Sequence, residues 1–156
     1  MSGEVTSALE TDAAAQRLAE ASAQALLAND SASASLGIRM AKVGPGFASL
    51  AMTVRSDMLN GHGTCHGGFV FALADSAFAV ACNTHNAVTV AAAAAIDFLI
   101  PARLQDELTA EARELWRSKR TGIYEIRVTN QLGETIALFR GRSHAIGGEI
   151  VPAQRT

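Results

Sequence analysis

The spacing of apolar residues changes along this chain, and the change predicts one long helix set among strands. Residues 66–83 are nearly all apolar or small, and Asp75 is the single charged side chain among them. An apolar run of this length is typical of a helix that the rest of a domain buries. We therefore expect a central helix from about His66 to Asn83.

Alternating apolar and polar residues predict strands before and after this helix. Tyr124, Ile126 and Val128, for example, share one face of an expected strand over 123–129. The strand over 89–99 contains the alanine run 91–95, although alanine in isolation favours a helix. The remaining strands are expected over 36–43, 47–55 (with Leu50, Met52 and Val54 on one face), 107–119 and 135–145, with turns at 44–46, 120–122 and 131–134.

The first 35 residues have a different character from the rest of the chain. A helix rich in alanine is expected from a cap at Thr11 or Asp12 to about Asn29. Its apolar face would contain Leu18, Ala21, Ala25 and Leu26. We divide the chain into a loose tail over 1–10, a helix and polar linker over 11–35, a main domain over 36–148 and a second tail over 149–156.

One long apolar helix with strands on both sides of it in the sequence favours an α+β domain, in which an antiparallel sheet wraps around the helix. The length of 156 residues and an apolar fraction of 49% fit a single domain with a substantial core. Such a sheet has open edges, and edge-to-edge pairing in a dimer would cover one of them.

Charge and cysteine content exclude several classes of function. The net charge is −2 with both signs interspersed, so no basic stripe indicates nucleic acid and no cationic face indicates a membrane surface. Cys65 and Cys82 would lie too far apart for a disulfide if both belong to the helix. With no signal peptide in the first ten residues, reduced thiols favour a cytoplasmic location. No metal is expected, because His62, Cys65 and His66 lack a second ligand cluster at a recurring spacing.

The candidate chemistry lies where a glycine-rich loop enters the central helix. Backbone N–H groups at a helix N-terminus, near Gly67, would suit a developing oxyanion, and a carboxylate on an apolar helix, Asp75, is unfavourable unless it is used. The two residues are eight positions apart, which is ~12 Å along a helix. One helix therefore cannot apply both groups to one bond, and two antiparallel helices in a dimer could. Local capping by Asp75 and close packing at the glycines are the alternative interpretation.

These residues resemble the hotdog-fold acyl-CoA thioesterases, above all the phenylacetate-degradation group. The resemblance runs over 36–148 and is carried by His66-Gly67-Gly68, by Asp75 nine residues after the histidine, and by 60–62, 73–77, 96–99 and 137–148. It implies a hotdog fold, hydrolysis of an aryl- or arylacetyl-CoA to the free acid and CoA, and homodimers that pair into tetramers. It implies no cofactor, since coenzyme A is part of the substrate.

The resemblance also implies roles for single residues. Asp75 would act as general base on water or attack the thioester directly. The amide of Gly67 would polarise the carbonyl, and Gly68 would leave room for the substrate. His66 and Asn60 would position the reactants, although a helix cap and a turn residue are their simpler interpretations.

Basic side chains form a second group of candidates. Lys119, Arg120, Arg140 and its neighbour Arg142 could contact coenzyme A phosphates, or form a solvated face. Some relatives carry a hydroxyl residue where this chain has the alanine run 91–95. Either another group such as Thr89 orients the water here, or Asp75 acts as a nucleophile.

Two other functions are alternatives to hydrolysis. A hotdog hydratase or dehydratase acting on CoA or acyl-carrier-protein thioesters would need a histidine and acid arranged for proton abstraction, and the motif of those enzymes is missing. A non-catalytic acyl-CoA sensor would need a DNA-binding unit, which the first 35 residues do not resemble.

Overall fold

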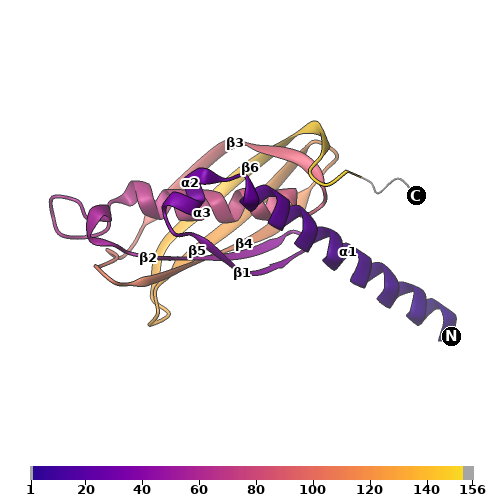
Figure 1. The fold of residues 1–156 in the computed structure, drawn as a ribbon, viewed down its shortest axis with the longest axis horizontal. Coiled ribbons are helices and arrows are strands. Elements are labelled where there is room, and N and C mark those ends of the chain that lie inside the picture. Colours follow the sequence, from indigo (N-terminus) through magenta and orange to yellow (C-terminus); the bar gives the residue numbers. More distant parts are fainter. Residues whose placement is uncertain (1, 153–156) are drawn as a thin grey trace.

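The fold places one long helix, α3 (Gly67–Asn83), across the inner face of a curved sheet (Figure 1). The computed structural model describes residues 2–152. The other elements are α1 (Ser2–Ala28), α2 (Ser31–Ser35), β1 (Arg39–Gly44), β2 (Phe47–Thr53), the short 3-10 helix η1 (Ser56–Met58), β3 (Ala87–Phe98), β4 (Glu107–Arg117), β5 (Thr121–Thr129) and β6 (Thr135–Glu149). The predicted α+β class is confirmed.

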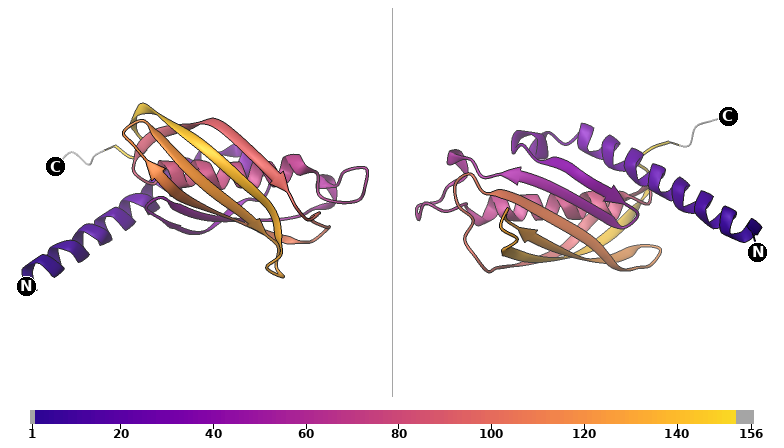
Figure 2. Two further views of the ribbon diagram at one scale, coloured as in Figure 1. Left: turned by 180° about the vertical axis from the view of Figure 1, so that it is seen from behind. Right: turned by 90° about the horizontal axis from the view of Figure 1, so that it is seen from below.

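The six strands form one antiparallel sheet in the order β1-β2-β4-β5-β6-β3. Figure 2 shows the sheet curving around α3 while α1 runs away from it. β3 is an edge strand that, among the described strands, pairs with β6 alone, and the alanine run 91–95 is exposed along it. Alanine is extended here because pairing with β6 on both sides of a bulge between Ala91 and Ala93 outweighs its helical preference.

Aromatic side chains join α3 to the sheet. The ring of Phe78 on α3 lies 5.4 Å from the ring of Tyr124 and 5.9 Å from the ring of Phe139. The predicted inward faces of β2 and β5 are confirmed, because all of their members are buried: Leu50, Met52, Val54, Tyr124, Ile126 and Val128.

The C-terminal end of α3 is held by a polar cluster. Glu114 of β4 accepts hydrogen bonds from the Tyr124 hydroxyl at 2.7 Å and from Nε2 of His85 at 2.9 Å, and Arg117 lies 3.4 Å away. Burial raises the pKa of Glu114, but these hydrogen bonds and the charges of His85 and Arg117 outweigh burial, so the pKa lies below its ordinary value. The cluster ties the residues after α3 to the middle of the sheet.

Two predictions for α1 are wrong. The helix begins at Ser2, and not at Thr11 or Asp12, so residues 2–10 are helical and not a loose tail. This segment contains no proline, so no residue in it lacks the backbone N–H that a helix needs.

The buried face of α1 also differs from the expected one. Ala19, Ser22 and Ala23 are fully buried, whereas Leu18 is exposed. Only the last turns of α1 pack against β1 and α3, and small side chains allow that close approach. Of the expected face, Leu26 packs against the core and Ala21 and Ala25 are half-buried. Hydrophobicity alone therefore misplaced Leu18 and missed the small residues that are fully buried.

The C-terminal end is longer and better anchored than the predicted tail from residue 149. β6 continues to Glu149, which pairs with Ala87 of β3. The Asn86 side chain then donates to the Val151 carbonyl at 2.9 Å and accepts from its N–H at 2.7 Å. These two hydrogen bonds hold the chain beyond the end of β6. An alternating pattern of apolar and polar residues cannot predict them, because they are made by the side chain of a distant residue. None of the described helices is long and apolar enough to cross a bilayer.

The contact between α3 and β6 gives a test of the packing. A Cβ atom on Gly141 would lie 2.7 Å from Cζ of Phe78, which is fully buried and cannot move aside. Gly141→Ala should therefore lower the free energy of unfolding by about 1–3 kcal/mol in denaturant titration. Gly61→Ala is the matched control, because nothing lies within 4 Å of its added methyl group. Equal stability of the two variants would contradict this account of the packing.

Candidate functional site

The loop before α3 leaves one backbone donor free at the start of the helix. His66 caps the helix, and its Nδ1 accepts a hydrogen bond from the Gly68 N–H at 2.9 Å. The Phe69 N–H donates to the His66 carbonyl at 3.0 Å. Gly67, the first residue of α3, donates its N–H to no described residue. This is the orphan donor at the positive end of a helix dipole that the sequence predicts near Gly67.

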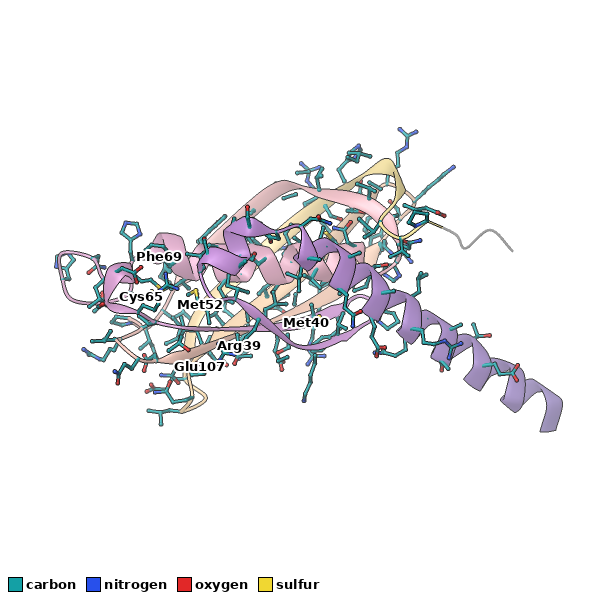
Figure 3. All side chains as sticks on the ribbon, viewed as in Figure 1. Arg39, Met40, Met52, Cys65, Phe69 and Glu107 are labelled. Atoms are coloured by element: carbon teal, nitrogen blue, oxygen red, sulfur yellow. The ribbon has the colours of Figure 1, made fainter. Side chains whose placement is uncertain are left out.

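Gly67 opens onto a cavity of ≈ 330 Å³. Its walls are apolar apart from Asn60 and Thr64 at the loop, and they consist mainly of Val70, Phe98, Leu99, Ile100, Pro101, Ala102 and Ile136. Figure 3 locates the region by Cys65 and Phe69, whose labels lie beside the start of α3. A largely apolar pocket beside a free amide can hold an apolar group next to a polarised carbonyl.

Asn60 shapes the loop at the mouth of this cavity. Its Oδ1 accepts from the His62 N–H at 2.9 Å and from the Thr64 N–H at 3.3 Å, while its Nδ2 donates to the Thr64 hydroxyl at 3.1 Å. The simpler interpretation of Asn60 as a turn residue is thus confirmed. Because Asn60 also lines the cavity, the same side chain lies within reach of a bound group.

His66 has the local role of a helix cap, and this role determines what its other nitrogen can do. Since Nδ1 accepts the Gly68 N–H, a neutral ring must carry its proton on Nε2. The side chain is exposed, so Nε2–H can donate to a ligand without breaking the cap.

Asp75 lies in the middle of α3 and is half-buried. No described residue donates a hydrogen bond to its carboxylate or forms an ion pair with it. Burial raises the pKa of Asp75 above its ordinary value. A partly desolvated, unpartnered carboxylate is a better base than an exposed one.

Gly67 and Asp75 lie on one continuous helix, eight residues apart. That spacing corresponds to ~12 Å, and Asp75 does not line the cavity beside Gly67. The structure therefore does not bring these two predicted groups together within one chain.

The predicted coenzyme A contacts fall in two separate places. Thr89, Lys119 and Arg120 line a small cavity with Cys82 and His85, at the C-terminal end of α3. The Thr89 hydroxyl donates to the Ala87 carbonyl at 2.8 Å, so it is already used locally.

Arg140 lies apart from both ends of α3. Its neighbours Phe139 and Gly141 point inward and are buried, so the exposed Arg140 projects from the outer face of the sheet. The single chain therefore separates Arg140, and with it Arg142, from the other candidates. Alternation along β6 would have shown this from the sequence.

The sequence analysis missed the cavity wall formed by Phe98, Leu99 and Ile100. Three large apolar residues in a row, directly before Pro101 at the end of a strand, were the available signal. Within residues 2–152, no group of three or more potential metal ligands lies together.

Comparisons with known proteins identify the family. A family model described as the thioesterase superfamily matches residues 62–137. The acyl-coenzyme A thioesterase PaaI of Escherichia coli is 50% identical over 128 residues, which cover 82% of this chain and 91% of the relative. This chain belongs to the thioesterase superfamily. The predicted membership, including the phenylacetate-degradation group, is confirmed, as is the prediction of a thioester-hydrolysing enzyme.

Solved structures agree with this assignment. The structure of the E. coli PaaI protein from the phenylacetic acid degradation operon matches with a TM-score of 0.85 and 48% identity, covering 86% of this chain and 97% of that one. A mutant of the phenylacetic acid degradation protein PaaI from Thermus thermophilus matches with a TM-score of 0.70 and 39% identity, covering 73% of this chain and 97% of that one. The predicted hotdog fold of this thioesterase is confirmed.

The raised pKa of Asp75 predicts that this residue lowers the stability of the thioesterase. The folded state binds the proton of Asp75 more tightly than the unfolded state, so ionisation opposes folding above the unfolded pKa of about 3.9. Asp75→Asn should therefore raise the free energy of unfolding at pH 7, by an amount that solvent screening of the half-buried carboxylate keeps small. The difference should disappear below about pH 3.9 in denaturant titrations. A variant that is less stable at pH 7 would show that the carboxylate has a structural partner.

Proposed function

We propose that this thioesterase hydrolyses acyl-CoA thioesters to the free acid and coenzyme A, with aryl or arylacetyl groups as the acyl class, in a site that two copies of the chain build together. The observation that carries the proposal is the free Gly67 N–H at the mouth of an apolar cavity. The acyl class is supported by the apolar walls of the cavity and by the origin of the E. coli relative in the phenylacetic acid degradation operon.

The start of α3 supplies the electrophilic half of the reaction. A thioester carbonyl that accepts the Gly67 N–H gains a hydrogen bond and the positive end of the helix dipole, and both strengthen as charge develops on its oxygen. Gly67 has no side chain to block this approach. Asn60 lines the cavity and His66 directly precedes Gly67, so the side chain of Asn60 and the exposed Nε2–H of His66 can orient the thioester.

Asp75 supplies the second half from the neighbouring subunit. Its carboxylate acts as general base on water, or attacks the carbonyl carbon and expels coenzyme A as its thiolate. The second route leaves a mixed anhydride, which water cleaves to the free acid and the restored Asp75 carboxylate. Both routes need the ionised form and a partly dry environment, and the half-buried position on α3 suits both. Direct attack needs no separate group to orient the first nucleophile, which fits the occupied hydroxyl of Thr89.

The free edge of β3 is where a second copy of the chain would bind. Antiparallel pairing of two β3 edges about a two-fold axis covers both edges and sets the two α3 helices antiparallel on one face of a continuous sheet. Exposed alanines along β3 place no bulky side chain in the way. Ala72 and Ala79, one turn on either side of Asp75 and only partly buried, allow close approach of a second helix.

The same two-fold axis would bring Lys119 and Arg120 of one subunit close to Gly67 of the other. The C-terminal end of α3 in one copy lies beside the N-terminal end of α3 in the other, so Lys119 and Arg120 of one subunit face the site that holds Gly67 of its partner. Their charges suit the phosphates of coenzyme A. Arg140 is left on the outer face, where pairing of dimers into tetramers would take place.

Removal of the Gly67 donor tests the proposal. Gly67→Pro deletes the N–H but suits the first position of a helix, and the extended conformation of His66 (φ −61°, ψ 131°) is the one that precedes proline. Gly67→Ala keeps the N–H and carries the same Cβ, so the ratio between the two variants isolates the donor. We expect kcat for phenylacetyl-CoA to be about 10²–10³-fold lower in Gly67→Pro than in Gly67→Ala. Equal kcat values for the two variants would show that the Gly67 N–H does not contribute to catalysis.

Mixing of inactive subunits tests whether the site is shared. Gly67→Pro and Asp75→Asn subunits are combined, unfolded and refolded together, and hydrolysis is followed by release of free thiol. A mixed dimer places both defects in one site and leaves the other intact, so random pairing restores about a quarter of wild-type activity. Each variant refolded alone is the control. If the mixture remains as inactive as its components, both groups act within one chain.

A further inference from the structure

One side chain of the cavity wall, Phe98, lies directly against the proposed oxyanion donor. A Cβ atom on Gly67 would be 3.0 Å from Cζ of Phe98 and 3.2 Å from its Cε1, so the ring tip covers the α-carbon of Gly67. Phe98 nevertheless keeps 54% of its surface exposed. The ring therefore belongs to the site and not to the core.

The backbone that carries this ring is fixed while the ring is not. Phe98 pairs with Ala137 of β6, and the N–H groups of the next two residues, Leu99 and Ile100, both donate to the Ile136 carbonyl, at 2.8 and 3.3 Å. The ring can change position only by rotation of its own side chain. Since one side of it faces solvent, such rotation meets little resistance.

The rest of the cavity wall divides into fixed and exposed parts. Val70, Ala102 and Ile136 are buried, with at most 2% of their surface exposed, and they form an immobile floor. Phe98, Leu99 and Ile100 are 54%, 53% and 41% exposed and form the outer wall. An acyl group whose carbonyl accepts the Gly67 N–H must pass along or displace the ring of Phe98.

We propose that Phe98 determines the acyl specificity of this thioesterase, as a movable aromatic wall between the Gly67 amide and the apolar cavity. A flat aromatic acyl group stacks on the ring or meets its edge, and gains attraction beyond the burial of area. A flexible alkyl chain gains only the burial. The cavity of ≈ 330 Å³ has room for one ring, since benzene occupies an engineered cavity of about 150 Å³ in another protein. This inference rests on the proposed acyl-CoA hydrolysis at Gly67.

The test compares two substrates that share the coenzyme A portion. The ratio of kcat/KM for phenylacetyl-CoA to that for hexanoyl-CoA cancels any loss of folded or assembled enzyme, because both substrates meet the same population. Phe98→Leu removes the ring and keeps an apolar side chain, so the ratio should fall about 3- to 10-fold. Phe98→Tyr keeps the ring, so the ratio should stay near the wild-type value.

Leu132→Ala is the control for loss of an exposed apolar side chain. Leu132 is 75% exposed at the turn between β5 and β6 and does not line the cavity, so its removal should leave the ratio unchanged. An unchanged ratio in Phe98→Leu, or an equal fall in Phe98→Leu and Phe98→Tyr, would overturn the role of Phe98 while leaving acyl-CoA hydrolysis in place. A wild-type enzyme that cleaves neither substrate would instead contradict the proposed function itself.

A double-mutant cycle gives independent evidence for the contact. The methyl group of Gly67→Ala pushes against the ring of Phe98, so this substitution should alter the substrate ratio in the wild-type background. In a Phe98→Leu background the ring is gone, and the same substitution should alter the ratio at least 3-fold less. Equal effects in the two backgrounds would show that the ring and Gly67 act separately.

Discussion

The close packing of α3 on the sheet is the constraint on which the site depends. Phe78 fits over Gly141 and between Tyr124 and Phe139, where no side chain can move aside. This contact sets the position of α3 along its own axis. A shift by one helical turn would move the helix start by ~5.4 Å and separate Gly67 from the end of β3.

The two ends of α3 are held in different ways, and the difference suits their roles. The far end is tied to β4 and β5 through Glu114, whose Oε2 accepts hydrogen bonds from both His85 and Tyr124. The near end is capped by His66, which satisfies Gly68 and leaves Gly67 free. A helix with every N-terminal donor satisfied would be more stable and would have nothing to offer a carbonyl oxygen.

Asp75 shows a similar opposition between stability and chemistry. Its carboxylate has no partner in the chain, and burial raises its pKa. A structural role would have required a donor nearby, as Glu114 has in Tyr124. The same half-buried face of α3 carries alanines on both sides of Asp75, so the charge lies where a second helix could approach most closely.

Most elements of the fold could be predicted from the sequence, because each has a local cause. The boundaries of α3 follow from the glycine-rich loop and the apolar run, and the inward faces of β2 and β5 follow from alternation. The length of α1 and its buried face could not, since Ala19 and Ser22 are selected by their small size against a neighbouring surface. The anchoring of Val151 by Asn86 likewise joins residues far apart in the chain.

In the candidate site, too, some features have a local cause in the sequence and others depend on contacts between distant parts of the chain. The sequence by itself determined the chemical groups: the amide of Gly67, the cap of His66 and the acid at residue 75, because helix capping and helix spacing are local properties. Only the tertiary structure decided that Phe98 covers Gly67 and that Thr89 and Lys119 gather at the opposite end of α3. These outcomes depend on which strands become neighbours and how α3 is seated among them, and no local pattern in the chain carries that information.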